Sequence, residues 1–241
     1  MPRIPESPED IFARFTEDVQ AAFGEELVSI ALFGSGARGE YVPEKSDINF
    51  IVVLTQKGMD RLNAALDLVA KWRKVKVAVP LFLTQEYIDS ALDTFPIEFL
   101  GMHKFHKNVF GKDCLSGLEI ESNDLRRQIE RELRGKLIYL RTGFLSAGGN
   151  RGRLQEMLAA SVAAFNAIFE GLLYLKGQDL PETRLKVFEK AAELFNLDKS
   201  VFAQLTLIKK GEWHGSQVQL QAIAMSYIFQ IKKMVELVNK I

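Results

Sequence analysis

Hydrophobic positions in the first third of the chain follow two different spacings. Runs with an apolar residue every three or four positions alternate with short segments that are apolar almost throughout. The first spacing is typical of an amphipathic helix and the second of a buried strand. The expected elements are a helix from Pro8 to Phe23, strands at 26–33 and 48–54, a helix from Met59 to Trp72 and a strand at 75–83. Pro80 suggests that the last strand is an edge strand or carries a bulge.

The second half of the chain shows helical spacing only. Breaks such as SAGGN, KGQDLP and GEWHGS separate its apolar runs. The expected helices are one from Leu125 through Phe144, then Leu154–Leu175, Glu182–Phe195, Val201–Ile208 and Val218–Val238. Segment 111–123 has turn residues and little periodicity. We therefore predict an α+β chain, with a small mixed β-sheet domain with flanking helices over residues 1–115 and an all-α helical bundle over 121–241.

The loop GSGARGEYVPEKSD, residues 34–47, joins the first two predicted strands. Glycine lets the backbone approach a ligand closely, and a helical start at residues 37–39 would direct amides and the Ser35 hydroxyl at one point. Such a nest binds phosphate, whereas the alternative is an ordinary glycine-containing turn. Asp47 begins the second strand and Asn49 lies two positions on, so their side chains share one side of the strand.

These residues resemble a known signature. GSGARGEYVPEKSDINF is similar to the G-S-x-A-R-G and S-D-x-D pattern of the nucleotidyltransferase superfamily, which includes kanamycin nucleotidyltransferase-like and minimal nucleotidyltransferase proteins. The resemblance covers about residues 8 to 110, and the helical domain that follows is also similar to that family's layout. It implies a small mixed-sheet catalytic domain that transfers a nucleoside monophosphate from a nucleoside triphosphate to a hydroxyl. The implied nucleotide-binding residues are Gly34, Ser35, Arg38 and Ser46, and the implied catalytic positions are Asp47 and Asn49.

The resemblance also implies magnesium, with Asp47 as its ligand, but the ligand set departs from the family's pattern. Asn49 stands at the position of the second aspartate, and Ala78 falls where the third carboxylate belongs. Two-metal phosphoryl transfer needs anionic oxygens to hold both ions. We therefore expect nucleotide and Mg²⁺ to bind while nucleotidyl transfer is weak or absent. Carboxylates that could replace the missing ligands are Glu40, Glu44, Glu86 and Glu98, although no spacing places them there.

A second hypothesis is a catalytically inactive regulatory or protein-interaction module. The dense apolar stripe of the helical half fits a bundle core, and its surplus would also serve a homodimer or a partner protein. The stripe contains Phe165, Ile168, Phe169, Leu172 and Leu173. Some nucleotidyltransferase relatives act beside a helical RNase of the HEPN family, but the arginine, polar and histidine motif of that family is missing here, so nuclease activity is not assigned.

Other candidate sites have simpler explanations. Arg38 fits a loop brace, paired with Asp47 or Glu40, better than a ligand contact. His103 and His106 have a spacing that can bind metal, but without a third ligand nearby they fit surface histidines better. A row of arginines on one predicted helix could attract an anion, yet neighbouring glutamates at i+4 spacing favour a solvated face. The row consists of Arg127, Arg131, Arg134 and Arg141.

Composition narrows the location and the partners. The chain of 241 residues has 31 basic and 31 acidic residues, so it lacks the basic excess of dedicated nucleic-acid binders. Cys114 is the single cysteine, which excludes an internal disulfide and fits a small buried side chain. The start MPRIPESPED does not read as a targeting segment, and no apolar run is expected to reach membrane-spanning length. We expect a cytoplasmic protein.

Overall fold

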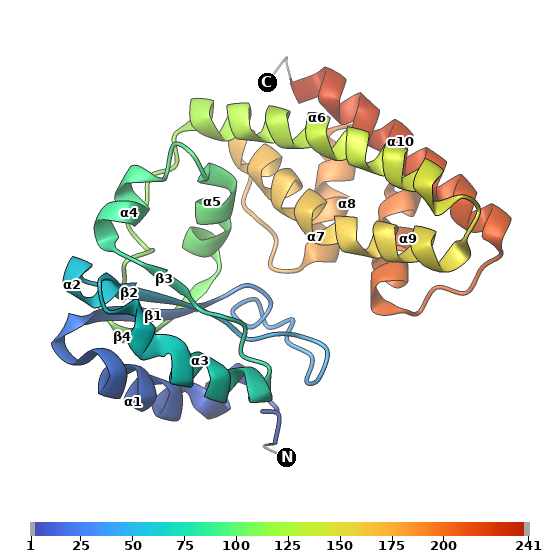
Figure 1. The fold of residues 1–241 in the computed structure, drawn as a ribbon. Coiled ribbons are helices and arrows are strands. Elements are labelled where there is room, and N and C mark those ends of the chain that lie inside the picture. The colour runs from blue at the N-terminus through green and yellow to red at the C-terminus, as the bar shows by residue number, and fades with distance from the viewer. Residues whose placement is uncertain (1–2, 239–241) are drawn as a thin grey trace. The chain divides into compact units, whose positions relative to one another are not determined.

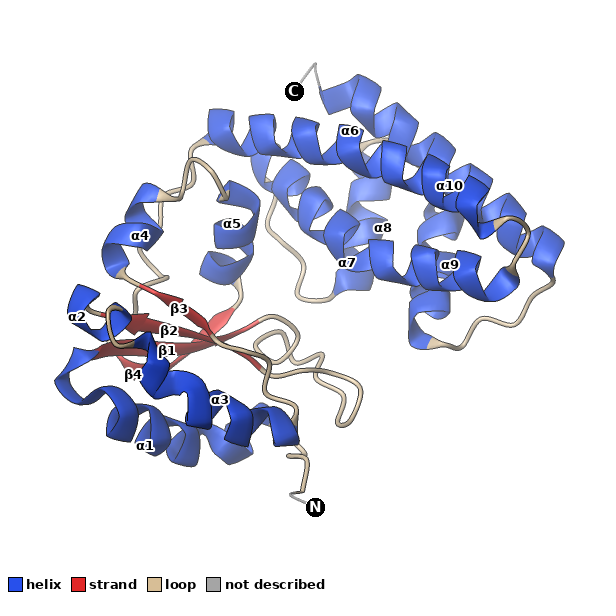
Figure 2. Ribbon diagram, in the orientation of Figure 1, coloured by secondary structure: helices blue, strands red, loops and turns tan. Residues whose placement is uncertain are grey.

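The structure, a computed structural model, describes residues 3–238. The chain forms two compact units. The first extends to Asp93 and resumes over Glu98–Ile120, and the second holds Thr94–Ile97 and the chain from Glu121 onward. The first unit contains a four-stranded mixed sheet, and the second is helical (Figure 2). The predicted fold class, α+β with a small mixed sheet followed by a helical bundle, is confirmed.

The sheet of the first unit has the order β3-β2-β1-β4. The central strand β1 pairs antiparallel with β2 and with β4, whereas β2 pairs parallel with β3. The strands are β1 Leu27–Phe33, β2 Asn49–Leu54, β3 Leu81–Leu83 and β4 His106–Gly111. The α-helices of this part are α1 Phe12–Phe23, α2 Gln56–Met59, α3 Leu66–Trp72, α4 Gln85–Ser90 and α5 Pro96–Lys104, and the 3-10 helices are η1 Pro8–Ile11, η2 Gly24–Glu26, η3 Leu62–Ala65 and η4 Arg73–Val75.

One face of this sheet carries the core of the unit. Helices α1 and α3 cover that face, while α4 and α5 lie on the other side (Figure 1). The ring of Phe15 stacks on Phe50 with centroids 4.2 Å apart, and Trp72 meets Phe15 edge to face. Full burial of one such aromatic side chain contributes about 1.5–3 kcal/mol. Because Ile48 and Phe50 belong to this core, the alternating residues Asp47 and Asn49 are directed to the opposite face.

Two predicted elements of this unit are wrong in extent. The strand expected at 75–83 is regular only over β3. Lys76 adopts a left-handed conformation (φ 67°), and between Lys76 and β3 only Val77 pairs, as an isolated bridge with Ile48. The helix expected from Met59 to Trp72 is interrupted: α2 ends at Met59, and the rest of the segment contains η3 and α3. Strand β4 was not predicted from its sequence HKNVFG.

The second unit is a bundle around α7. This helix contacts α6, α8, α9 and α10. The apolar stripe of α7 is fully buried, as expected for a core, and the Phe169 ring meets Phe188 and Phe202 edge to face. The helices are α6 Ser122–Ala147, α7 Arg151–Leu175, α8 Arg184–Leu194, α9 Lys199–Lys210 and α10 Gln217–Val238. The predicted helices of this half are therefore confirmed, with ends shifted by a few residues.

The sequence-based expectation that no apolar run is long enough to span a membrane is wrong. Helix α7 is long and apolar enough to cross a membrane by length and hydropathy alone. However, 61% of its apolar window is buried inside the structure, as in the central helix of a bundle. The hydrophobicity of α7 is therefore explained by its packing partners.

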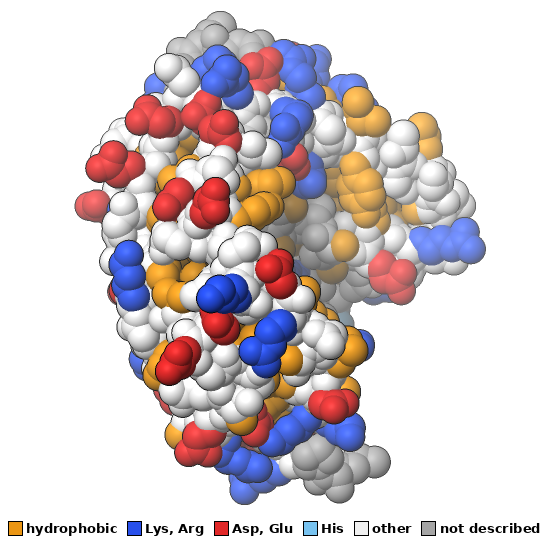
Figure 3. All heavy atoms as spheres, turned by 60° about the vertical axis from the view of Figure 1, so that its left-hand side comes forward, with side chains coloured by type: hydrophobic (Ala, Val, Ile, Leu, Met, Phe, Trp, Pro, Cys, Tyr) orange, Lys and Arg blue, Asp and Glu red, His pale blue; other side chains and the backbone are white. Residues whose placement is uncertain are grey.

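The arginine row on α6 forms ion pairs along the helix. Arg134 bonds Glu130 at 2.9 Å and Lys136 bonds Glu132 at 3.3 Å, both at the predicted i,i+4 spacing. Arg127 pairs with Asp124 one turn before it. Such exposed pairs contribute about 0.3–0.5 kcal/mol each. The expected solvated face is confirmed, and in Figure 3 basic and acidic side chains are interspersed over the face that is drawn.

Candidate functional site

The loop between β1 and β2 begins with a tight turn. Gly34 directly follows β1 and has a positive φ of 74°. The Arg38 amide donates to the Gly34 carbonyl at 3.2 Å, and the Glu40 amide donates to the Ser35 carbonyl at 2.9 Å. Gly39 also has a positive φ, 71°. We call residues 34–40 the glycine turn. Residues 34–39 form a turn and no helix, so the helical start predicted for residues 37–39 is wrong: Gly39 has a left-handed conformation.

Backbone donors are available in the glycine turn. Within residues 3–238, the structure shows no hydrogen-bond acceptor for the amides of Ser35, Gly36 and Ala37. Gly36 is packed closely, since a Cβ there would lie 3.2 Å from atoms of both Leu32 and Pro8. Consecutive amides at the start of a helical turn form an anion-binding arrangement. These three amides are the candidate donors for such an anion.

Asn49 packs directly against the glycine turn. Asn49 opposes Phe33 in the β1–β2 ladder, and a Cβ on Gly34 would lie 3.2 Å from its Nδ2. Nδ2 of Asn49 donates to the Asp47 carbonyl at 3.2 Å. Asp47 itself is exposed and lies two positions before Asn49, the first residue of the strand β2 that Asp47 was expected to begin. Asn49 thus lies beside the start of the turn at one end of β1 and β2, and Asp47 precedes Asn49 by two residues.

Ala78 lies on the segment that continues this edge. The Ile48 amide donates to the Lys76 carbonyl at 2.8 Å, and the Ala78 amide donates to the Ile48 carbonyl at 2.9 Å. Because Val77 belongs to the core on the helix-covered face, the next residue along the extended chain is directed to the face of Asn49. A methyl group offers no metal ligand there.

Ser46 and Tyr41 hold the rest of the loop. The Ser46 hydroxyl accepts from the Val42 amide at 3.0 Å, and the Ser46 amide donates to the Val42 carbonyl at 2.8 Å. The Tyr41 hydroxyl donates to the Pro5 carbonyl at 3.1 Å. In the structure, Ser46 therefore closes a turn beside Asp47, and its nucleotide-binding role stays a prediction.

Arg38 has a partner that sequence reasoning missed. Its guanidinium carbon lies 3.5 Å from the centroid of the Phe105 ring, which precedes β4. A guanidinium over an aromatic face is attracted by the negative face of the ring. Arg38 is thus braced by an aromatic ring, a contact that could not be foreseen because β4 was not predicted.

The donor set at this edge fits one magnesium ion better than two. Asp47 supplies one carboxylate, and Asn49 can add a neutral amide oxygen because its Nδ2 is already bonded to backbone. Over residues 3–238, no group of three or more His, Cys, Asp or Glu side chains is arranged to hold a metal. Magnesium is commonly bound by one or two carboxylates together with substrate phosphates and water. A single ion that shares its ligands with a triphosphate fits this set.

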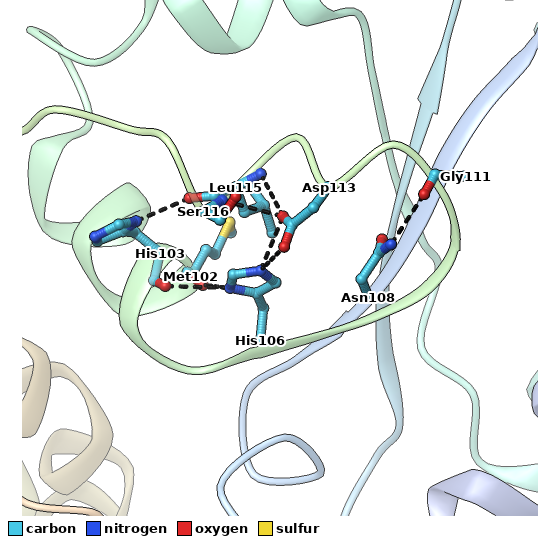
Figure 4. A network of polar contacts seen from close by, with 8 residues as sticks. All are labelled: Met102, His103, His106, Asn108, Gly111, Asp113, Leu115 and Ser116. Carbon is cyan, nitrogen blue, oxygen red and sulfur yellow. Dashed lines mark hydrogen bonds and ion pairs between the residues drawn. The ribbon is translucent and has the colours of Figure 1, made fainter.

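The two histidines do not form a surface pair. His103 lies in the last turn of α5, which ends at Lys104, whereas His106 starts β4, so the two histidines do not share one helix. The side chain of His106 is only 10% exposed, and its Nε2 lies 3.0 Å from a carboxylate oxygen of Asp113 (Figure 4). The prediction of surface histidines is therefore wrong for His106, which takes part in an internal polar network.

A match to a family model gives the class of domain for the first unit. Residues 13–104 match the model of the nucleotidyltransferase domain family, so the first unit contains a nucleotidyltransferase domain. The chain is also similar in structure to spectinomycin adenyltransferase AAD(9) from Enterococcus faecialis, which was crystallised with ATP and spectinomycin. The TM-score is 0.54 at 12% sequence identity, with 93% of this chain and 98% of that chain covered. At this identity the likeness shows a shared fold. No curated protein matched in sequence.

Proposed function

We propose that the first unit binds a nucleoside triphosphate with one magnesium ion and transfers its nucleotidyl group to a hydroxyl acceptor weakly or not at all. The nucleotidyltransferase domain and the shared fold support nucleotidyl transfer as the general chemistry. The observation that carries the proposal is the contact of the glycine turn with Asn49 at one end of β1 and β2, where Asp47 precedes Asn49 by two residues. In this proposal, the backbone donors of the turn and the Asp47 carboxylate act on the same triphosphate.

Each residue of this edge has a distinct proposed role. The amides of Ser35 to Ala37 and the Ser35 hydroxyl donate to phosphate oxygens, and glycine at position 34 lets the phosphates approach the backbone. Asp47 holds the ion, and Arg38 keeps the turn in place through Phe105. When bound, magnesium would offset the negative charge of the phosphates. These interactions require no carboxylate at positions 49 or 78.

The weak transfer follows from the same donor set. A second ion and a general base both need anionic oxygens, and Asn49 and Ala78 supply none. An attacking hydroxyl at this edge therefore loses a group that could accept its proton. Binding of a triphosphate depends mainly on donors and on one carboxylate, so binding is less affected than transfer.

Thermal unfolding tests binding directly. A ligand present at one hundred times its Kd stabilises the folded state by about 2.7 kcal/mol. We expect MgATP or MgGTP to raise the Tm of the wild-type chain, and magnesium chloride alone to have little effect. Nucleotide with EDTA is the matched control. If neither nucleotide shifts the Tm at millimolar concentration, the proposed binding function is wrong.

Asn49→Asp tests the explanation for weak transfer. The new carboxylate would restore an anionic ligand two residues from Asp47, on the same side of β2. We expect tighter magnesium binding in the presence of nucleotide, followed by a smaller gain in nucleotidyl transfer because position 78 still lacks a carboxylate. Asn49→Gln, which stays neutral, is the control. Equal magnesium affinity in both variants would exclude Asn49 from the metal site.

A second candidate function is protein interaction through the helical unit. The stripe on α7 proposed for this role is buried and so is unavailable. The helices α6 and α10 pack against each other. Both helices also carry apolar side chains that are exposed. They are Ile138 and Leu145 on α6 and Val218, Met225 and Phe229 on α10. Sedimentation velocity over a range of concentrations tests self-association, and the expected dimer should be lost in Leu145→Ser with Phe229→Ser.

A further inference from the structure

We propose that His106, Asp113 and Phe105 form a positioning network that holds the glycine turn from the β4 side. The network lies in the first unit, and none of its members belongs to the proposed nucleotide or metal ligands. Its effect on nucleotide affinity rests on the proposed function, whereas its effect on the order of the turn does not. Both effects are measurable separately.

His106 is bound at both ring nitrogens (Figure 4). Nδ1 lies 2.9 Å from the Met102 carbonyl and 3.1 Å from the His103 carbonyl, at the end of α5. Nε2 lies 3.0 and 3.2 Å from the two carboxylate oxygens of Asp113. Each ring nitrogen therefore has oxygen atoms within hydrogen-bond distance, which fixes the orientation of the ring.

Asp113 connects His106 to the loop that follows β4. Its Oδ1 accepts from the amides of Leu115 and Ser116, each at 3.0 Å. The Leu115 carbonyl in turn contacts His103 Nδ1 at 2.8 Å. Partial burial acts to raise the pKa of Asp113, but the hydrogen bonds from Leu115, His106 and Ser116 together lower it. The carboxylate therefore stays ionised and ties α5 to this loop.

Two contacts extend from the network to the glycine turn. Phe105, the residue before His106, donates its amide to the Gly101 carbonyl at 3.0 Å and presents its ring to Arg38. His106 itself opposes Phe33, the last residue of β1 before Gly34. Fixing His106 thus fixes the ring that braces Arg38 and the strand end from which the turn starts. Charge-assisted hydrogen bonds contribute more than neutral ones, which favours a well-defined position.

Amide hydrogen exchange of the full chain tests the network without nucleotide. In Phe105→Leu the ring contact is lost, and a cation–π interaction of about 0.5–1 kcal/mol corresponds to about two- to fivefold faster exchange in residues 34–46. Phe105→Tyr keeps the ring and should exchange like the wild type. Phe110→Leu is the matched control, because Phe110 lies at the other end of β4 opposite Ile30. Its exchange in residues 34–46 should be unchanged.

His106→Gln and nucleotide titrations complete the test. We expect His106→Gln to accelerate exchange in residues 34–46 at least as much as Phe105→Leu, and both variants to raise the Kd for MgATP and MgGTP while Phe110→Leu does not. Unchanged exchange in Phe105→Leu, with a folded chain, would overturn the proposal even if His106→Gln fails to fold. Faster exchange in a protein whose wild type binds neither nucleotide would support the network and reject the proposed function.

Discussion

Gly34 has an unusual backbone conformation and lies in the proposed binding site. Its φ of 74° is one that L side chains rarely adopt, and the three atoms nearest to an added Cβ all belong to Asn49. Gly39 has a similar φ of 71° with open space around it. Substitutions at the two glycines therefore distinguish two effects. Both change the backbone conformation, but only a substitution at Gly34 also needs space beside Asn49.

Alanine substitution at these two positions gives a matched comparison. We expect Gly34→Ala and Gly39→Ala each to lose about 1–2 kcal/mol of unfolding free energy, because both place a Cβ in the left-handed region. Only Gly34→Ala should also weaken MgATP affinity, since its methyl group displaces Asn49 and occupies the phosphate approach. Urea unfolding and nucleotide titration measure the two effects. Equal losses of affinity in both variants would contradict the assigned role of Gly34.

Asp113 gives a pH dependence with a defined sign. Its folded pKa is lowered by hydrogen bonds from Leu115, His106 and Ser116 that outweigh its desolvation. The carboxylate therefore contributes stability that is fully present above its unfolded pKa of about 3.9 and is lost as pH falls through the lower folded value. The Tm of the wild type should fall between about pH 5 and pH 3, a window set by these pKa values. We expect a smaller fall in Asp113→Asn, which has no carboxylate to protonate. An identical pH profile in the variant would show that Asp113 is not so stabilised.

At the scale of elements, α7 is the helix on which the second unit depends. Phe169 has 0% exposure and contacts rings from α8 and α9. Phe229 on α10 is 57% exposed in the same unit. We expect Phe169→Ala to cost about 3–5 kcal/mol and Phe229→Ala to change stability by no more than about 0.5 kcal/mol. Urea unfolding followed by far-UV circular dichroism measures both, and similar losses would contradict this assignment of the core.

The elements differ in how well their sequences predict them. The long helices of the second unit were predictable because their apolar residues recur over several turns, and β1 and β2 because both are buried runs of branched residues. Strand β4 was missed because it is an edge strand whose residues His106, Lys107 and Asn108 have no strand preference. It forms because its backbone pairs with β1, and such long-range pairing leaves no local pattern.

The same limit applies to the candidate site. Gly34, Asp47 and Asn49 could be found from the sequence, because they lie within one loop and the strand after it. Phe105 and Asp113 could not, because they reach the glycine turn through β4 and α5, whose side chains carry no recognisable motif. Ser46 was assigned to nucleotide on its place in the motif, whereas the structure shows its hydroxyl closing a turn.

At the scale of the whole molecule, the two units have separate sources of stability and different proposed roles. The first has its core between the sheet and α1 with α3, and the second has its core around α7. The glycine turn, Asp47 and Asn49 all belong to the first unit. The proposed binding of nucleotide thus requires no residue of the helical unit. The proposed roles of that unit are to bind the acceptor or a partner protein.

Isothermal titration of MgATP and MgGTP into the wild-type chain and Asp47→Asn tests the central claim most directly. The account predicts that the wild type binds at least one nucleotide more tightly with magnesium than with EDTA. It also predicts that Asp47→Asn loses most of this magnesium dependence while it stays folded. Equal nucleotide affinity in both proteins, with the same response to magnesium, would contradict the claim that Asp47 and the glycine turn form a metal-assisted triphosphate site.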